Sequence, residues 1–180
     1  MNIYENVDKR AAKALALLAQ LFPFTWQQEN MFTYRAEGKK PAAWWELHYT
    51  AGKKKKWLSR IFKAEVSYTF PLAEQREQRL YWIPSKKVWK NEANAACPLA
   101  QRLSADKEIT SLLTSVDMER VEIVQKGEAA TITIVPIPGC FVWTMIPPFH
   151  YYVRLKAEEA NTIMGVAQRL ESKILHADKV

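Results

Sequence analysis

The sequence predicts an α+β fold in which a curved, predominantly antiparallel sheet of about seven to eight strands packs against roughly three or four helices. Three observations lead to this class. Apolar residues recur at helical spacing near both chain ends and in a central segment, residues 98–116. The segments between them alternate apolar and polar residues, as antiparallel strands with one covered face do. The resulting order is α-β-α-β-α, and this grouping of strands argues against a parallel α/β fold.

The first helix is expected over residues 5–21, because Leu15 and Leu18 lie on one helical face and Pro23 ends the pattern. The alternation that follows indicates antiparallel strands in a meander, with a loop after Pro71. The strands expected in this region cover residues 31–38, 42–50, 63–70 and 78–84.

The central helical segment begins with Pro98 in a first turn, and Ser104 is expected to cap a second helix within it. After this segment, residues 118–139 predict a hairpin that turns at Gln125–Ala129. Two short strands and a closing helix complete the chain. They are expected at residues 140–146, 151–155 and 157–175.

Length and composition predict one domain of ordinary size. The chain has 180 residues, 48% of them hydrophobic, which is enough to build a core. We expect a single domain over residues 1–180, with an organisation in two halves, 1–93 and 94–180, as the alternative. No apolar run approaches the roughly 20 residues needed to cross a bilayer, and the N-terminus lacks the features of a signal peptide. We therefore expect a cytoplasmic protein whose Cys97 and Cys140 remain free thiols.

Positive charge is concentrated in one part of the chain. The formal net charge is +7, and the segment from Arg35 to Lys90 carries fourteen Lys/Arg against five Glu, a net charge of +9. The remaining residues carry twelve positive and fourteen negative charges, so they are close to neutral. A localised excess of this kind attracts anionic partners but says nothing about the fold.

Two lysine clusters, each beside a tryptophan, form the predicted anion-binding site. If the strands follow one another in a meander, the strand over 78–84 returns to the turn that holds the first cluster, and both clusters meet at one end of the sheet. Lysines would contact phosphates and the tryptophan rings could stack on bases, whereas a solubilising turn is the alternative. The predicted residues are Lys53, Lys54, Lys55, Lys56, Trp57, Arg60, Lys86, Lys87, Trp89 and Lys90.

The aromatic residues support a second interpretation. The chain has seven Trp, seven Tyr and seven Phe, and several of them crowd into neighbouring strands, so some rings must leave the covered face. These are Trp44, Trp45, Tyr49, Trp57, Tyr68, Phe70, Tyr81 and Trp82. They could form a homodimer interface or enclose an apolar ligand between the sheet and the last helix. The lining residues expected for such a cavity are Trp45, Tyr49, Tyr68, Trp82 and Trp143.

No motif in the sequence indicates catalysis. Glu46 and His48 share one face of a strand, which suits a cross-strand pair better than a proton-transfer site. The three His and two Cys have no zinc spacing, and no glycine-rich phosphate loop is present. We therefore expect a non-enzymatic binding protein without cofactor or metal. Its expected partner is nucleic acid or another polyanion, an acidic protein or lipid headgroups, and the alternative is a small apolar ligand.

Overall fold

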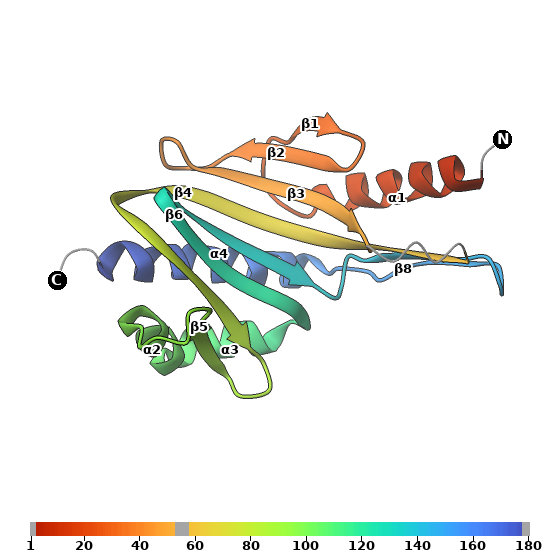
Figure 1. Ribbon diagram of the computed structural model, residues 1–180. Coiled ribbons are helices and arrows are strands. Elements are labelled where there is room, and N and C mark those ends of the chain that lie inside the picture. The colour runs from red at the N-terminus through yellow and green to blue at the C-terminus, as the bar shows by residue number, and fades with distance from the viewer. Residues whose placement is uncertain (1–2, 53–57, 178–180) are drawn as a thin grey trace.

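The computed structural model describes residues 3–52 and 58–177, which form an α+β fold with one antiparallel sheet of eight strands and four helices (Figure 1). The predicted fold class and the order α-β-α-β-α are confirmed. In chain order the elements are α1 (Ile3–Ala19), β1 (Gln27–Asn30), β2 (Thr33–Glu37), β3 (Trp44–Ala51), β4 (Ser59–Ile83), β5 (Val88–Asn91), α2 (Pro98–Ala105), α3 (Lys107–Ser115), β6 (Met118–Pro136), β7 (Phe141–Thr144), β8 (Phe149–Tyr152) and α4 (Ala157–Ala177).

The long strand β4 organises the sheet. The strand order is β1-β2-β3-β4-β7-β8, and both β5 and β6 also pair with β4. Its 25 residues contact four other strands, β3 and β7 near its start and β5 near its end, with β6 along much of its length. Alternating apolar residues on β3 and β4 explain why one face of this sheet is buried, with Leu47 and Ala64 fully enclosed.

β4 and β6 form one sharply bent ribbon. Their pairing runs from Val66–Pro71 opposite Ala129–Ile134 to Arg76–Tyr81 opposite Glu122–Gly127, with a register shift between the two stretches. Figure 1 shows both strands folding back at this point, and the backbone N–H of Ile137 donates to the carbonyl of Asp117 at 2.8 Å. This bond joins the chain just after β6 to the chain just before it.

The bend corrects two predictions. Residues 63–70 and 78–84 belong to one continuous strand, so the expected meander with a loop after Pro71 is wrong. The expected hairpin at Gln125–Ala129 is also wrong, because β6 passes through these residues without reversing its pairing. At this point residues 72–75 of β4 lie opposite Glu128 alone on β6, and this large bulge in β4 bends the ribbon.

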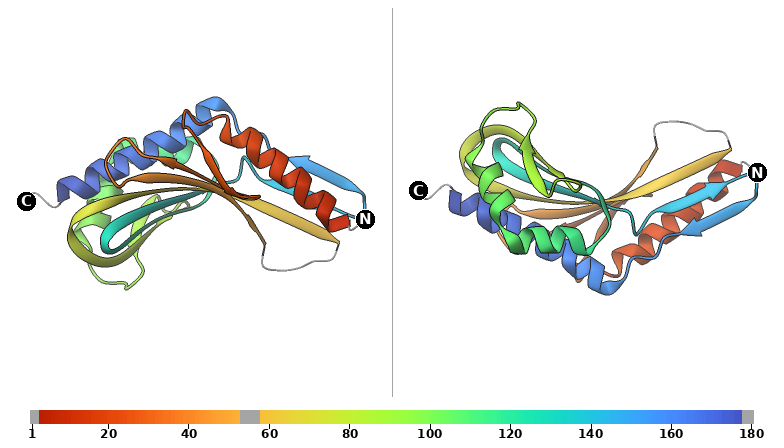
Figure 2. Two further views of the ribbon diagram at one scale, coloured as in Figure 1. Left: turned by 90° about the horizontal axis from the view of Figure 1, so that it is seen from above. Right: turned by 90° about the horizontal axis from the view of Figure 1, so that it is seen from below.

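The helices cover the sheet from one side. α1 packs against β3 and β7, α2 against β5, and α4 against β4 and β6, as the two views in Figure 2 show. The apolar faces of the helices supply the core: Leu15 and Leu18 of α1 are buried, as are Ile163 and Leu170 of α4. The core is continuous from α1 to α3.

The central helical segment is broken into α2 and α3 at Asp106. The Asp106 carboxylate accepts hydrogen bonds from the backbone N–H groups of Glu108 and Ile109, both at 3.0 Å, and so caps α3. Ser104 was expected in this role, but its hydroxyl accepts from the backbone N–H of Trp89 at 2.8 Å. Pro98 does occupy the first turn of α2, as predicted.

Candidate functional site

The predicted anion-binding residues do not form one cluster within the described chain. Lys53, Lys54, Lys55, Lys56 and Trp57 lie outside the described residues. Among the described members, Arg60 lies at the start of β4, whereas the others lie on β5 or in the turn before it, beyond the end of β4. Figure 1 shows that the two ends of β4 lie at different ends of the molecule, so the geometric premise of the prediction is wrong.

The cluster at β5 has exposed lysines but a buried tryptophan. Lys86, Lys87 and Lys90 are exposed, whereas Trp89 is only 4% exposed and packs against Trp82 with a ring separation of 5.8 Å. The Trp89 ring is therefore part of the core and is not available to stack on a base. Lys90 borders a cavity of about 620 Å³ between β5 and α2.

Arg60 holds two elements together. Its guanidinium donates to the Asp8 carboxylate at 2.7 Å and lies 4.4 Å from the ring centroid of Tyr4, both on α1. Arg60 therefore ties α1 to the start of β4, and its charge is partly compensated within the fold.

The turn between β7 and β8 lies against the start of β4. β3 ends at Ala51, β7 ends at Thr144, and Ser59 pairs with Thr144. The backbone N–H of Met145, just after β7, donates to the carbonyl of Leu58 at 2.8 Å. The turn between β7 and β8 therefore contacts Leu58, which is two residues after Lys56 in sequence.

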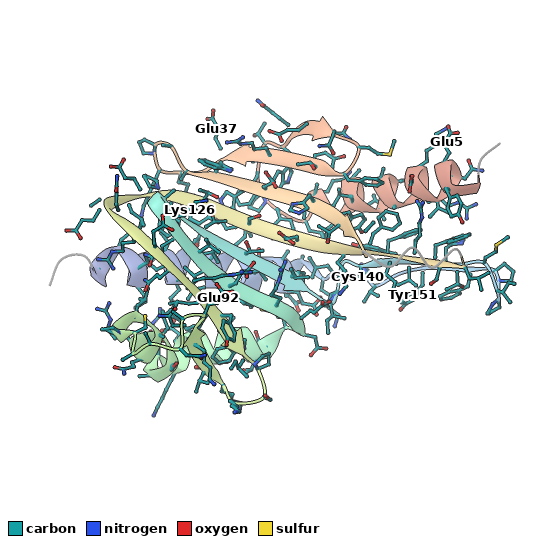
Figure 3. All side chains as sticks on the ribbon, viewed as in Figure 1. Glu5, Glu37, Glu92, Lys126, Cys140 and Tyr151 are labelled. Carbon is teal, nitrogen blue, oxygen red and sulfur yellow. The ribbon has the colours of Figure 1, made fainter. Side chains whose placement is uncertain are left out.

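This end of the molecule exposes large apolar side chains, which we call the apolar tip. Ile146 is 72% exposed, and Phe149 and Tyr151 stack on each other with ring centroids 5.9 Å apart. Tyr151 projects from β8 at the end of the molecule that also holds the labelled Glu5 of α1 (Figure 3). The apolar tip consists of Ile61, Met145, Ile146, Phe149 and Tyr151, five of the eight exposed large hydrophobic residues among those described.

The chain segments around the apolar tip are poor in carboxylates. The sequence contains no Asp or Glu between Glu46 and Glu65, or between Glu128 and Glu158. α1 contributes two carboxylates nearby, and each contacts a cation: Glu5 contacts Lys9 at 2.9 Å, and Asp8 contacts Arg60 at 2.7 Å.

A basic side chain of α1 also contacts the hairpin at the tip. The guanidinium of Arg10 lies 3.4 Å from Nδ1 of His150. Lys9 holds the pKa of Glu5 below its usual range through a hydrogen bond and its charge. Cations therefore accompany the exposed apolar side chains at this end.

The residues predicted to line an apolar cavity pack together in the core. The rings of Trp45 and Tyr68 stack at 4.4 Å, and the buried Tyr49 hydroxyl donates to the Gly139 carbonyl at 2.6 Å. Burial raises the pKa of Tyr49 far above its usual value. Trp82 and Trp143 lie in other parts of the sheet, on β4 and β7. Neither of two cavities formed by the described residues has any of the five predicted residues in its wall.

A larger groove of about 1120 Å³ lies between the α1–β1 loop, the β2–β3 turn and α4. Its walls combine cations, amides and apolar side chains from segments far apart in sequence. Sequence reasoning missed this site, although Arg35, Lys39 and Lys40 belong to the basic segment. Its lining includes Phe24, Gln27, Arg35, Lys39, Lys40, Trp44, Asn161, Gly165 and Gln168.

Glu46 and His48 lie in an ion-pair network on the outer face of the sheet. His48 Nδ1 is 3.2 Å from Glu46 without hydrogen-bond geometry, and His48 Nε2 is 3.6 Å from Glu65 on β4. Glu65 in turn accepts a hydrogen bond from Arg120 at 2.9 Å. The described residues contain no group of three or more His, Cys, Asp or Glu side chains placed to hold a metal ion. This arrangement is a cross-strand charge network of the kind expected from sequence.

The fold thus defines an α+β protein built on one bent antiparallel sheet with an apolar tip and a separate groove. A family described as protein of unknown function, DUF3156, matches residues 17–174, and the chain belongs to this family. Comparison with curated proteins and with solved structures gave no match. In the part of the chain that the structure describes, no helix is both long and apolar enough to span a bilayer.

Proposed function

We propose that the protein binds an anionic lipid surface through its apolar tip and the cations beside it. The observation that carries this proposal is the concentration of exposed Met145, Ile146, Phe149 and Tyr151 on one hairpin, next to chain segments without carboxylates. Monomeric proteins rarely expose contiguous large apolar side chains without an interaction that covers them.

The chemistry of the tip favours a lipid surface over nucleic acid. A phosphate backbone attracts lysines, but it offers nothing that would cover the aliphatic side chains of Met145 and Ile146. A bilayer offers both an anionic headgroup layer and an apolar layer beneath it, and aromatic rings such as Phe149 and Tyr151 suit the boundary. Burying one large aliphatic or aromatic side chain contributes about 1.5–3 kcal/mol.

The first lysine cluster supplies the cationic part of the proposal by its place in the sequence. Lys53–Lys56 precede Leu58, whose carbonyl accepts the hydrogen bond from Met145. Each cation near an anionic membrane surface contributes about 1 kcal/mol at physiological ionic strength. Apolar insertion and charge together would give reversible binding, as is usual for proteins held by two weak signals.

The test is sedimentation of the protein with lipid vesicles. We expect the protein to bind phosphatidylcholine vesicles that contain about 30 mol % phosphatidylserine, to bind pure phosphatidylcholine much more weakly, and to dissociate as salt rises. The double variant Ile146→Gln/Phe149→Gln should lose most of this binding. Leu17→Gln is the matched control, because Leu17 is also an exposed apolar residue but lies near the C-terminal end of α1, whereas the contacts of α1 with Arg60 and His150 come from its N-terminal half.

Replacing Lys53–Lys56 with Ser should reduce the preference for phosphatidylserine while leaving the fold intact, as measured by circular dichroism. Equal binding of the double variant and the Leu17→Gln control would refute the role of the tip. Binding to a single-stranded oligonucleotide without binding to vesicles would refute the lipid proposal and favour the nucleic-acid partner expected from sequence.

A further inference from the structure

The groove beside α4 is a separate site with its own chemistry. It lies between the β2–β3 turn, the α1–β1 loop and α4, whereas the apolar tip is formed by the β7–β8 hairpin and the start of β4 (Figure 1). Its volume of about 1120 Å³ would accommodate a ligand of ordinary metabolite size, for which sites of about 300–1,000 Å³ are typical.

A glycine in the middle of α4 keeps the floor of the groove open. Gly165 lies in the interior of a 21-residue helix, where glycine is less favourable than alanine. A β-carbon at Gly165 would meet no atom of a neighbouring element within 4 Å, so packing does not require glycine there. Gly38 in the β2–β3 turn differs, because a β-carbon there would lie 2.9 Å from the Ala43 side chain. Packing therefore does not require glycine at position 165, and the absence of a side chain there leaves open space beside α4.

An ion pair between the half-exposed Lys40 and the buried Glu171 ties the β2–β3 turn to α4. Lys40 in the β2–β3 turn contacts Glu171 of α4, with 2.9 Å between Nζ and Oε1. The same carboxylate, which is buried, accepts a hydrogen bond from the Tyr68 hydroxyl at 3.1 Å. The turn is thus tied to the helix by contacts within the chain, and this preorganisation lowers the cost of ordering a site.

The opposite wall presents a flat cation on an aromatic ring. The guanidinium carbon of Arg35 lies 4.5 Å from the ring centroid of Trp44. Glu29 approaches Arg35 only at 3.7 Å, a long contact between exposed groups that a ligand anion could replace. Lys39 adds a second cation to the lining, and Glu37 is the carboxylate among the lining residues.

Three amide side chains complete the lining: Gln27, Asn161 and Gln168. Amides form paired hydrogen bonds with the edges of nucleobases, and a guanidinium plane accepts a stacked base. A purely apolar ligand would leave the amides and cations without partners, at a cost in affinity. We propose that this groove binds a nucleotide, with its base stacked on the Arg35–Trp44 pair and its phosphates extending past Lys39 toward Gly165 and the amides of α4.

Isothermal titration of the full chain with each of the four ribonucleoside 5′-triphosphates tests the proposal. We expect at least one of them to bind, and the matching nucleoside without phosphates to bind roughly tenfold more weakly or not at all. Gly165→Leu should fill the floor, and Trp44→Leu should remove the platform, each weakening binding by roughly tenfold. Ser172→Leu is the matched control, because Ser172 is exposed on α4 but outside the groove, and it should bind as the wild type does.

Two outcomes would overturn the proposal. One is a wild-type protein that binds none of the four triphosphates, and the other is a folded Gly165→Leu variant with unchanged affinity. If Gly165→Leu does not fold, the affinities of Trp44→Leu and Arg35→Gln are measured instead, and unchanged affinity in both folded variants overturns the proposal. Nucleotide binding by the Ile146→Gln/Phe149→Gln protein should equal that of the wild type, so failure at the groove and failure at the lipid surface are distinguishable.

Discussion

Replacement of Asp106 by alanine should destabilise the protein at the junction between α2 and α3. The side chain of Asp106 caps α3 through two backbone hydrogen bonds of 3.0 Å. It also contacts two cations of α4, Lys173 at 2.8 Å and Arg169 at 3.8 Å. One carboxylate therefore starts one helix and fastens it to another.

The expected loss follows from these contacts. Loss of an N-cap costs about 0.5–2 kcal/mol, and each partly exposed ion pair adds a few tenths. We expect Asp106→Ala to lower the free energy of unfolding by about 1.5–2.5 kcal/mol. In a chain of this size that corresponds to a fall in Tm of about 4–8 °C. Asp106→Asn should cost less, because asparagine is an equally good cap and loses only the charge.

The pH dependence separates the two contributions. Burial alone raises the pKa of Asp106, but the hydrogen bond from Lys173, the N–H of Ile109 and the charges of Lys173 and Arg169 outweigh it, so the pKa in the folded protein lies below its ordinary value. The unfolded state then binds the proton at higher pH than the native state does. The stabilisation is therefore fully present above about pH 5 and is lost as pH falls below about 4 and through the lower pKa of the folded state.

Urea unfolding of wild type, Asp106→Ala and Asp106→Asn at several pH values measures these differences. The gap between wild type and Asp106→Asn should be constant from about pH 7 to 5 and should narrow in more acidic solution. A gap that stays constant at low pH, or an alanine variant as stable as the asparagine variant, would refute this account of the α2–α3 junction.

Two further predictions concern the groove wall. Gly165→Ala should raise the free energy of unfolding by about 0.5–1 kcal/mol, because alanine favours the helix and meets no neighbour, and a rise in Tm of about 1–4 °C would show it; a fall in Tm would contradict the open floor. Tyr68→Phe removes the hydroxyl bonded to the buried Glu171 and should cost about 1 kcal/mol in chemical denaturation, whereas an unchanged stability would show that Lys40 alone satisfies this carboxylate.

The sequence predicted the fold class and the helices well because their apolar periodicity depends on burial in the final structure. It failed at the bend of β4 and β6, where Pro71 and Gly127 suggested turns. A bulge of this kind uses the same residue types as a turn: Gly127 takes a positive φ of 61°, and polar residues occupy the exposed bend. A bulge differs from a turn only in how distant segments pair, and the alternation of residues within a single strand carries no information about that pairing.

The strands β1 and β5 were missed for a different reason. β1 reads Gln27–Asn30 and is exposed along its whole length, so it has no apolar alternation. β5 has only four residues, of which Trp89 alone is fully buried. Pairing with a neighbour forms such strands, and their own composition gives little sign of it.

Sequence reasoning found part of each candidate site. It predicted a strand at residues 151–155, next to the hairpin of the apolar tip, but gave no role to the exposed apolar side chains there. The long stretch without carboxylates between Glu128 and Glu158 was the available signal. The groove could not be found in this way, because its walls come from three segments whose proximity depends on the packing of α4. Gly165 within an otherwise regular helix was the one local indication.

The dependence of β4 on later parts of the chain has a consequence for how the protein is made. β4 ends at Ile83, but two of its partners, β6 and β7, begin only at Met118 and Phe141. At usual ribosomal speeds of about 5–20 residues per second, the apolar edge of β4 waits for several seconds before it can pair. During synthesis this edge is open to wrong pairing with other chains. The nascent protein should therefore depend on chaperones more than the folded protein does.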